Sequence, residues 1–155
     1  MSASMKMRKP ERIVPAMPDD GPDLGRPIIL VVDDEPVTLK TATIILRRAG
    51  YSVWTAASGE EALAKLQQPA VSISLLLTDV IMSGISGPEL AEQALHENSD
   101  LRILMMSAGT PDRLERFRSA AGRFPILPKP LVADVLLAAI RYTLSPRVQA
   151  VANHI

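Results

Sequence analysis

Short apolar runs alternate with amphipathic stretches along most of this chain, and this alternation constrains the fold more than any other feature. Short runs rich in aliphatic and β-branched side chains are typical of strands that are buried on both faces. Five runs are predicted as strands: Ile28–Val32, Ser52–Ala56, Ile73–Thr78, Arg102–Met106 and Phe124–Leu127.

Helical patterns fill the intervals between the predicted strands. The first begins at Pro36, a residue favoured in the first turn, and ends near Gly50. Ser58 to Glu61 and Ser86 to Glu89 each fit a capping box, and the second of these helices extends to about His96. Two more helices are expected from Thr110 to about Ala121 and over Val132–Leu144. Strict alternation of this kind predicts an α/β fold, a doubly wound five-stranded parallel sheet with helices on both faces.

The ends of the chain differ from this pattern. Residues 1–27 hold five of the 13 prolines and nine charged residues without an apolar period, so we expect a disordered leader there. Residues 145–155 are expected to be a short tail. The predicted organisation is therefore one domain over residues 28–144, with no second domain at either end.

Composition excludes several classes of function. Seventeen basic and 17 acidic residues cancel, so a basic surface for nucleic acid is not expected. The chain has no Cys, which excludes disulfides, thiolate metal sites and a cysteine nucleophile. The longest apolar run, Val135–Ile140, is far too short to span a bilayer. A soluble cytoplasmic protein is the expectation.

Polar residues follow four of the predicted strands. Because the carboxyl ends of parallel strands meet at one edge of a sheet, we expect these residues to converge there. They are Asp33, Asp34 and Glu35 after the first strand, Asp79 after the third, Ser107 after the fourth and Lys129 after the fifth.

Such a group of carboxylates requires a compensating cation. Two carboxylates about 4 Å apart repel by roughly 4 kcal/mol at an effective dielectric constant near 20. Lys129 supplies one positive charge, and Mg²⁺, which prefers carboxylate oxygens, would supply the rest. A carboxylate beside both cations is well placed to attack phosphorus. The alternative is that these acids are a solvated turn and a helix cap.

Four motifs carry a resemblance to a known family: VVDDEP (Val31–Pro36), LLLTDVIM (Leu75–Met82) with Gly87 downstream, MMSA (Met105–Ala108) and LPKP (Leu127–Pro130). In these motifs and their spacing, residues 28–144 resemble the receiver domain of two-component response regulators, of the chemotaxis-regulator type. The resemblance implies a flavodoxin-like sheet with strand order 2-1-3-4-5.

The resemblance also implies a role for each site residue. Asp79 would be the phosphoacceptor. Mg²⁺ would be held by Asp33, Asp34, Asp79 and the backbone carbonyl of Ile81. Lys129 and Ser107 would contact the phosphoryl oxygens, and a cis peptide bond would precede Pro130.

Three positions depart from the family pattern. Ser83 stands where the family often has Pro, and Val132 stands where a Ser or Thr cap is common. Ile126 replaces an aromatic residue that in the family swings inward when the hydroxyl residue moves, so we expect this switch to be muted on its aromatic side. Phe124, two residues earlier on the predicted strand, is a possible substitute for that aromatic residue.

The expected function is that of a stand-alone receiver in a two-component phosphorelay. It would accept a phosphoryl group from a histidine kinase or phosphotransfer protein and signal by protein contacts, with no DNA-binding domain and no catalysis beyond its own phosphorylation and dephosphorylation. Two alternatives stay open: a Mg²⁺-dependent phosphohydrolase with an aspartate nucleophile, and a receiver fold used only as a binding module.

Overall fold

The computed structural model describes residues 25–109 and 123–146. Its centre is one parallel sheet with strand order β2-β1-β3-β4-β5, which confirms the fold class and strand order expected from the sequence. The strands are β1 (Ile28–Val32), β2 (Ser52–Ala56), β3 (Leu75–Asp79), β4 (Arg102–Ser107) and β5 (Ile126–Pro128).

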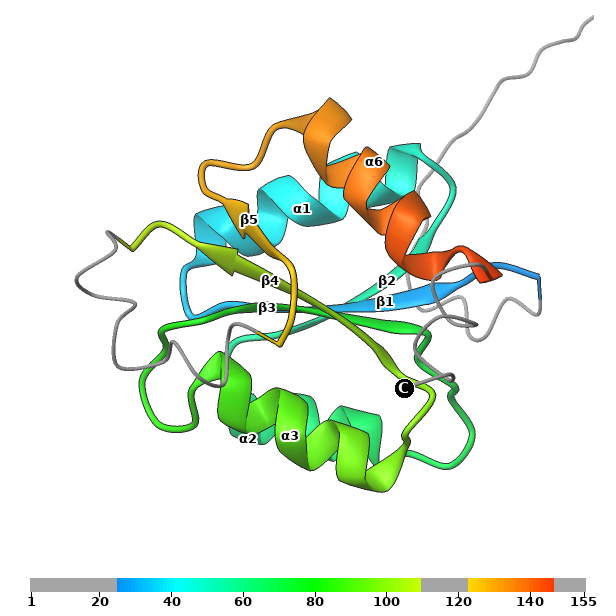
Figure 1. Ribbon diagram of the computed structural model, residues 1–155, viewed down its shortest axis with the longest axis vertical. Helices are drawn as coiled ribbons and strands as arrows, with labels where there is room; N and C mark the ends of the chain where they lie inside the picture. The colour runs from blue at the N-terminus through cyan, green and yellow to red at the C-terminus, as the bar shows by residue number, and fades with distance from the viewer. Residues whose placement is uncertain (1–24, 110–122, 147–155) are drawn as a thin grey trace, which may run out of the picture.

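In the part of the chain that the structure describes, two helices lie on each face of the sheet (Figure 1). Helices α1 (Pro36–Arg48) and α6 (Ala133–Leu144) lie on one face, and α2 (Gly59–Leu66) and α3 (Gly87–Glu97) lie on the other. The helix predicted from Thr110 to Ala121 falls outside the described residues, as do residues 1–24 and 147–155. Within the described ranges, no helix combines the length and apolarity that crossing a membrane requires.

The alternation of side chains along each strand builds two cores. In β1, Leu30 and Val32 belong to the core under α2 and α3, whereas Ile29 and Val31 belong to the core under α1 and α6. All five β1 residues are buried, as expected for a strand covered on both faces. Helices therefore pack against both faces of the sheet, and this packing fixes the positions of the residues that follow each strand at its carboxyl edge.

Of the two predicted capping boxes, one is complete and the other is partial. At α3 the capping box is complete: Ser86 Oγ accepts from the Glu89 N–H, and the Glu89 carboxylate accepts from the Ser86 N–H. At α2 the Ser58 side chain caps the Glu61 N–H, but the Glu61 carboxylate accepts from the N–H of Ala57 rather than of Ser58. Helix α6 begins after Val132 without a side-chain cap.

Three strands differ from the prediction in their bounds. β3 begins at Leu75 rather than Ile73, because its pairing with β1 starts at Ile29 opposite Leu75, and it ends at Asp79 rather than Thr78. β4 extends one residue further, to Ser107.

The prediction of a strand over Phe124–Leu127 was wrong at its start. Pro125 has no N–H to donate to a ladder, and pairing with β4 begins only at Ile126 opposite Met105. Phe124 therefore precedes β5, and the strand period does not place it on the same face as Ile126.

Candidate functional site

Four strands deliver polar residues to the carboxyl edge of the sheet. Asp33 directly follows β1, Asp79 ends β3, Ser107 ends β4 and Lys129 directly follows β5. Because β1, β3, β4 and β5 are consecutive neighbours in the sheet, residues up to 96 positions apart in sequence meet at this edge. The convergence expected from the strand ends is therefore present.

Three carboxylates gather in what we call the acid cluster: Asp33, Asp34 and Asp79. Each offers a carboxylate oxygen, and these oxygens all lie within 4.8 Å of one another. Asp33 and Asp79 are buried, whereas Asp34 is exposed. Three hard oxygen ligands at this spacing form a donor set that suits a divalent cation such as Mg²⁺.

Lys129 bridges the two buried carboxylates. Its Nζ donates to Asp33 Oδ2 at 2.7 Å and to Asp79 Oδ2 at 3.3 Å, and it lies 3.6 Å from Glu35 Oε1. A backbone hydrogen bond from the Lys129 N–H to the Ser107 carbonyl, at 2.9 Å, positions the start of its segment. The peptide bond between Lys129 and Pro130 is cis, as the sequence resemblance implied.

Backbone donors hold the two adjacent acids. The Glu35 N–H donates to Asp33 Oδ1 at 2.9 Å, so both oxygens of the buried Asp33 are engaged. The Ser83 N–H, from the loop after β3, donates to Asp34 Oδ2 at 3.3 Å. The sequence patterns predict neither of these donors. Ser83 stands where the family often has Pro, and a proline at this position would have no N–H to donate to Asp34.

The surroundings oppose ionisation of Asp79. Burial, followed by the negative charge of Asp33, raises the pKa of Asp79 to about 6, although Lys129 works in the opposite direction. For Lys129, burial alone would lower the pKa, but the hydrogen bond to Asp33 and the charge of Asp79 outweigh it and raise the pKa.

The charges in the cluster do not balance. Three ionised carboxylates and one ammonium leave a formal charge of −2, since −3 and +1 sum to that value. Mutual repulsion of this kind is relieved by protonation or by a bound cation. The burial of Asp79 beside the charge of Asp33, which together raise its pKa, therefore fits a divalent metal at this position.

Ser107 and Ile81 lie beside the cluster. Ser107 is buried, and its Oγ accepts from the Gly109 N–H at 2.9 Å. Ile81 lies two residues after Asp79 and is partly buried. The roles assigned to Ser107 as a phosphoryl contact and to the Ile81 carbonyl as a metal ligand stay predictions.

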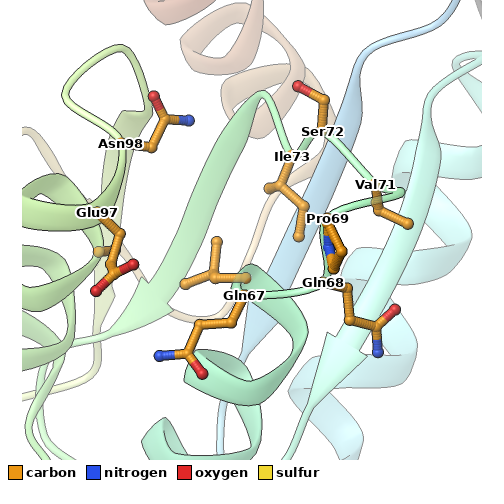
Figure 2. Close-up of a pocket in the computed structure, with 10 residues that line it drawn as sticks. Gln67, Gln68, Pro69, Val71, Ser72, Ile73, Glu97 and Asn98 are labelled. Atoms are coloured by element: carbon orange, nitrogen blue, oxygen red, sulfur yellow. The ribbon is translucent and has the colours of Figure 1, made fainter.

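A pocket of about 330 Å³ lies at the opposite edge of the sheet, beyond the ends of α2 and α3 (Figure 2). It is lined by Gln67, Gln68, Glu97 and Asn98 together with apolar side chains such as Ile73. Both helices end where the chain turns back toward the amino ends of β3 and β4, so this pocket is separated from the acid cluster by the length of a strand. Among the described residues that line this pocket, Glu97 is the one with an ionisable side chain, so the lining does not indicate a catalytic or metal site.

Comparison with known proteins identifies relatives of this arrangement. A family model described as the response regulator receiver domain matches residues 29–141. The sensor kinase CckA of Brucella abortus is 28% identical over 117 residues, which are 76% of this chain and 12% of that protein.

Two solved structures have the same fold. Chemotaxis protein CheY4 of Vibrio cholerae is 30% identical with a TM-score of 0.69, over 77% of this chain and 100% of that one. Response regulator protein TrrA of Thermotoga maritima, solved in complex with Mg²⁺ and BeF, is 30% identical with a TM-score of 0.66, over 76% of this chain and 99% of that one.

The curated relatives are longer than the matched region. The chain spans 12%, 19% and 50% of the length of three of them. The likeness therefore concerns one domain of those proteins, and the activities of the whole proteins do not follow from it.

Proposed function

This chain belongs to the response regulator receiver family, and from that premise we propose that it accepts a phosphoryl group on Asp79. The donor would be a histidine kinase or a phosphotransfer protein of a two-component phosphorelay. The observation that carries the proposal is the position of Asp79, buried at the end of β3, within 4.8 Å of two further carboxylates and 3.3 Å from the ammonium of Lys129.

The proposed transfer moves one phosphoryl group between two residues. A carboxylate oxygen of Asp79 attacks phosphorus, the bond from phosphorus to the imidazole nitrogen of the donor breaks, and that nitrogen keeps the electron pair and takes up a proton. Positioning and charge neutralisation are what this chemistry needs from a protein. Lys129 would neutralise one phosphoryl oxygen, and the Ser107 hydroxyl would donate to another.

The acid cluster is the proposed Mg²⁺ site. Asp33, Asp34, Asp79 and the Ile81 carbonyl would hold the ion, whose charge would offset that of the incoming phosphoryl group. Solved in complex with Mg²⁺ and BeF, the receiver-family structure of Thermotoga maritima supports this proposal.

Signalling would occur through protein contacts in the cytoplasm. Relatives such as the sensor kinase CckA carry the matching region within a much longer protein. Apart from catalysing its own phosphorylation and dephosphorylation, the protein would not act as an enzyme.

The decisive experiment is incubation with acetyl phosphate and Mg²⁺, followed by intact-mass measurement. We expect a gain of one phosphoryl group in wild-type protein, and no gain in Asp79→Ala or when EDTA replaces Mg²⁺. Stoichiometric labelling of Asp79→Ala would refute the assignment of the acceptor. Sustained turnover of p-nitrophenyl phosphate would instead indicate a phosphohydrolase.

A further inference from the structure

The loop between β3 and α3 is fixed at several points around Ser83. The Val80 N–H donates to the Met106 carbonyl and the Gly87 N–H donates to the Val80 carbonyl, each at 2.9 Å. Met82, directly before Ser83, is 9% exposed and packs in the core under α2 and α3. The N–H of Ser83 is therefore presented to Asp34 from an anchored segment.

Asp34 is the member of the acid cluster that most needs such a restraint. Asp33 is completely buried and accepts from both Glu35 and Lys129, and Asp79 is 7% exposed and accepts from Lys129. Asp34 is exposed, and its Oδ2 accepts a hydrogen bond from the Ser83 N–H. Without that bond, repulsion from the two buried carboxylates favours a rotamer that points into water.

We propose that the backbone N–H of Ser83 is a positioning group, which holds the Asp34 carboxylate toward the other two acids and thereby strengthens Mg²⁺ binding. This inference rests on the proposed function of the acid cluster as the Mg²⁺ site. A carboxylate oxygen has lone pairs for both the N–H and the metal, so the hydrogen bond restrains Asp34 without displacing the ion. Proline at this position would have no such donor.

The matched variants are Ser83→Pro, which removes the N–H, and Ser83→Ala, which keeps it and removes only the hydroxyl. Proline is the residue that the family often has at this position, so the family's loop accommodates it. Mg²⁺ dissociation constants are measured by isothermal titration calorimetry with MgCl₂.

We expect Ser83→Ala to bind Mg²⁺ like wild-type protein and Ser83→Pro to bind it about fivefold more weakly. A fivefold loss is typical of an ordinary hydrogen bond and smaller than that of most bonds to a charged group, because Asp34 is exposed and the bond is long. In an Asp34→Ala background the two Ser83 variants should bind Mg²⁺ equally. A fivefold difference that persists in that background would mean that proline acts by distorting the loop, which would overturn the proposal.

A metal-free measurement separates this inference from the proposed function. In EDTA, the difference in urea midpoint between Ser83→Pro and Ser83→Ala should change when Asp34 is replaced by Ala, because the variants differ in a contact to Asp34. Equal Mg²⁺ affinity in both Ser83 variants, beside normal binding by wild-type protein, would overturn this inference alone. Absence of Mg²⁺ binding by wild-type protein would overturn the proposed metal site, and the role of Ser83 with it.

Discussion

At the scale of single residues, Asp79 carries a conflict between reactivity and stability. In the proposed function the carboxylate must be ionised to attack phosphorus, yet burial and the charge of Asp33 raise its pKa to about 6. Lys129 lowers the pKa of Asp79 but does not bring it back to the ordinary value, because its single positive charge is shared between Asp79 and Asp33. The metal-free site is therefore held at a cost in stability that a bound cation would offset.

This cost predicts a pH dependence for the metal-free protein. Because the pKa of Asp79 is raised from 3.8 to about 6, the folded state binds more protons than the unfolded state between these values, and stability falls as the pH rises through them. In EDTA, Asp79→Asn should be more stable than wild-type protein by about 3 kcal/mol at pH 7.5 and about equal to it near pH 4. Urea unfolding at a series of pH values measures this, and a pH-independent difference would contradict it.

A second prediction concerns the lifetime of the phosphorylated state. The family resemblance places Ile81 and Gly109 beside the path of the water that hydrolyses the acyl phosphate, and neither side chain can orient a water by hydrogen bonding. The Gly109 N–H is itself engaged with Ser107 Oγ. Introducing Ile81→Asn together with Gly109→Glu should speed decay about tenfold, the effect of one contact worth about 1.4 kcal/mol in the transition state.

Decay is followed by intact mass after removal of acetyl phosphate. Ile81→Val with Gly109→Ala changes the same positions without adding a polar group and serves as the control. If the polar pair decays no faster than the control, water positioning does not limit the lifetime.

At the scale of elements, the junction of β3 and α3 depends on the absence of a side chain at Gly87. A Cβ there would lie 2.1 Å from the Asp79 carbonyl oxygen and 2.9 Å from the Val80 Cα. Both neighbours are backbone atoms, so no change of rotamer relieves the clash. The start of α3 can therefore approach the strand that carries Asp79 only with glycine at this position.

Gly87→Ala should destabilise the protein by about 3 kcal/mol, the upper range for overpacking, and weaken Mg²⁺ binding by moving Asp79. Gly59→Ala is a matched comparison, because Gly59 also begins a helix, but its Cβ would lie 2.9 Å from the Ile85 Cβ and not against the strand that carries Asp79. It should therefore lower stability without weakening Mg²⁺ binding. Thermal melts and MgCl₂ titration of both variants provide the measurement. Equal losses of stability and of Mg²⁺ affinity in the two variants would show that the close approach of Gly87 to Asp79 does not position the metal site.

Strand β5 shows where sequence patterns fail at this scale. It has only three residues, and its first, Ile126, is 39% exposed, so hydrophobic periodicity carries little information there. Phe124 is partly buried against the core under α2 and α3 and stacks with Arg123 at 5.3 Å, outside the strand. The period of two therefore offers no support for Phe124 as a substitute for the missing aromatic residue, and the muted switch stays a prediction.

At the scale of the whole molecule, the sheet was predictable because its signals are redundant. Each of β1, β3 and β4 is an apolar run too short for a helix, and serine caps and glycines mark the intervening elements. The convergence of Asp33, Asp79, Ser107 and Lys129 followed from topology alone. The bond from Ser83 to Asp34 could not be foreseen, because a backbone N–H leaves no pattern in the sequence and its direction is set by how the loop folds.

The proposed metal site makes the stability of the whole fold depend on Mg²⁺. An ion that binds the folded state alone stabilises it by RT ln(1 + [Mg²⁺]/Kd). Above the dissociation constant, one site therefore predicts that the free energy of unfolding rises by about 1.4 kcal/mol for each tenfold increase in Mg²⁺. Two sites would double this slope. Binding also requires ionised carboxylates, so the slope should diminish on acidification below the pKa of Asp79, about 6.

Urea unfolding at pH 7.5 over a series of MgCl₂ concentrations, with ionic strength held constant by KCl, measures the slope. Asp34→Ala with Asp79→Asn should abolish it while leaving the protein folded, because removing two of the three carboxylates also removes the repulsion among them. A slope that survives in the double variant would place the stabilising ion elsewhere on the molecule. A slope absent from wild-type protein would mean that the acid cluster does not select Mg²⁺, and that Lys129 alone offsets its charge.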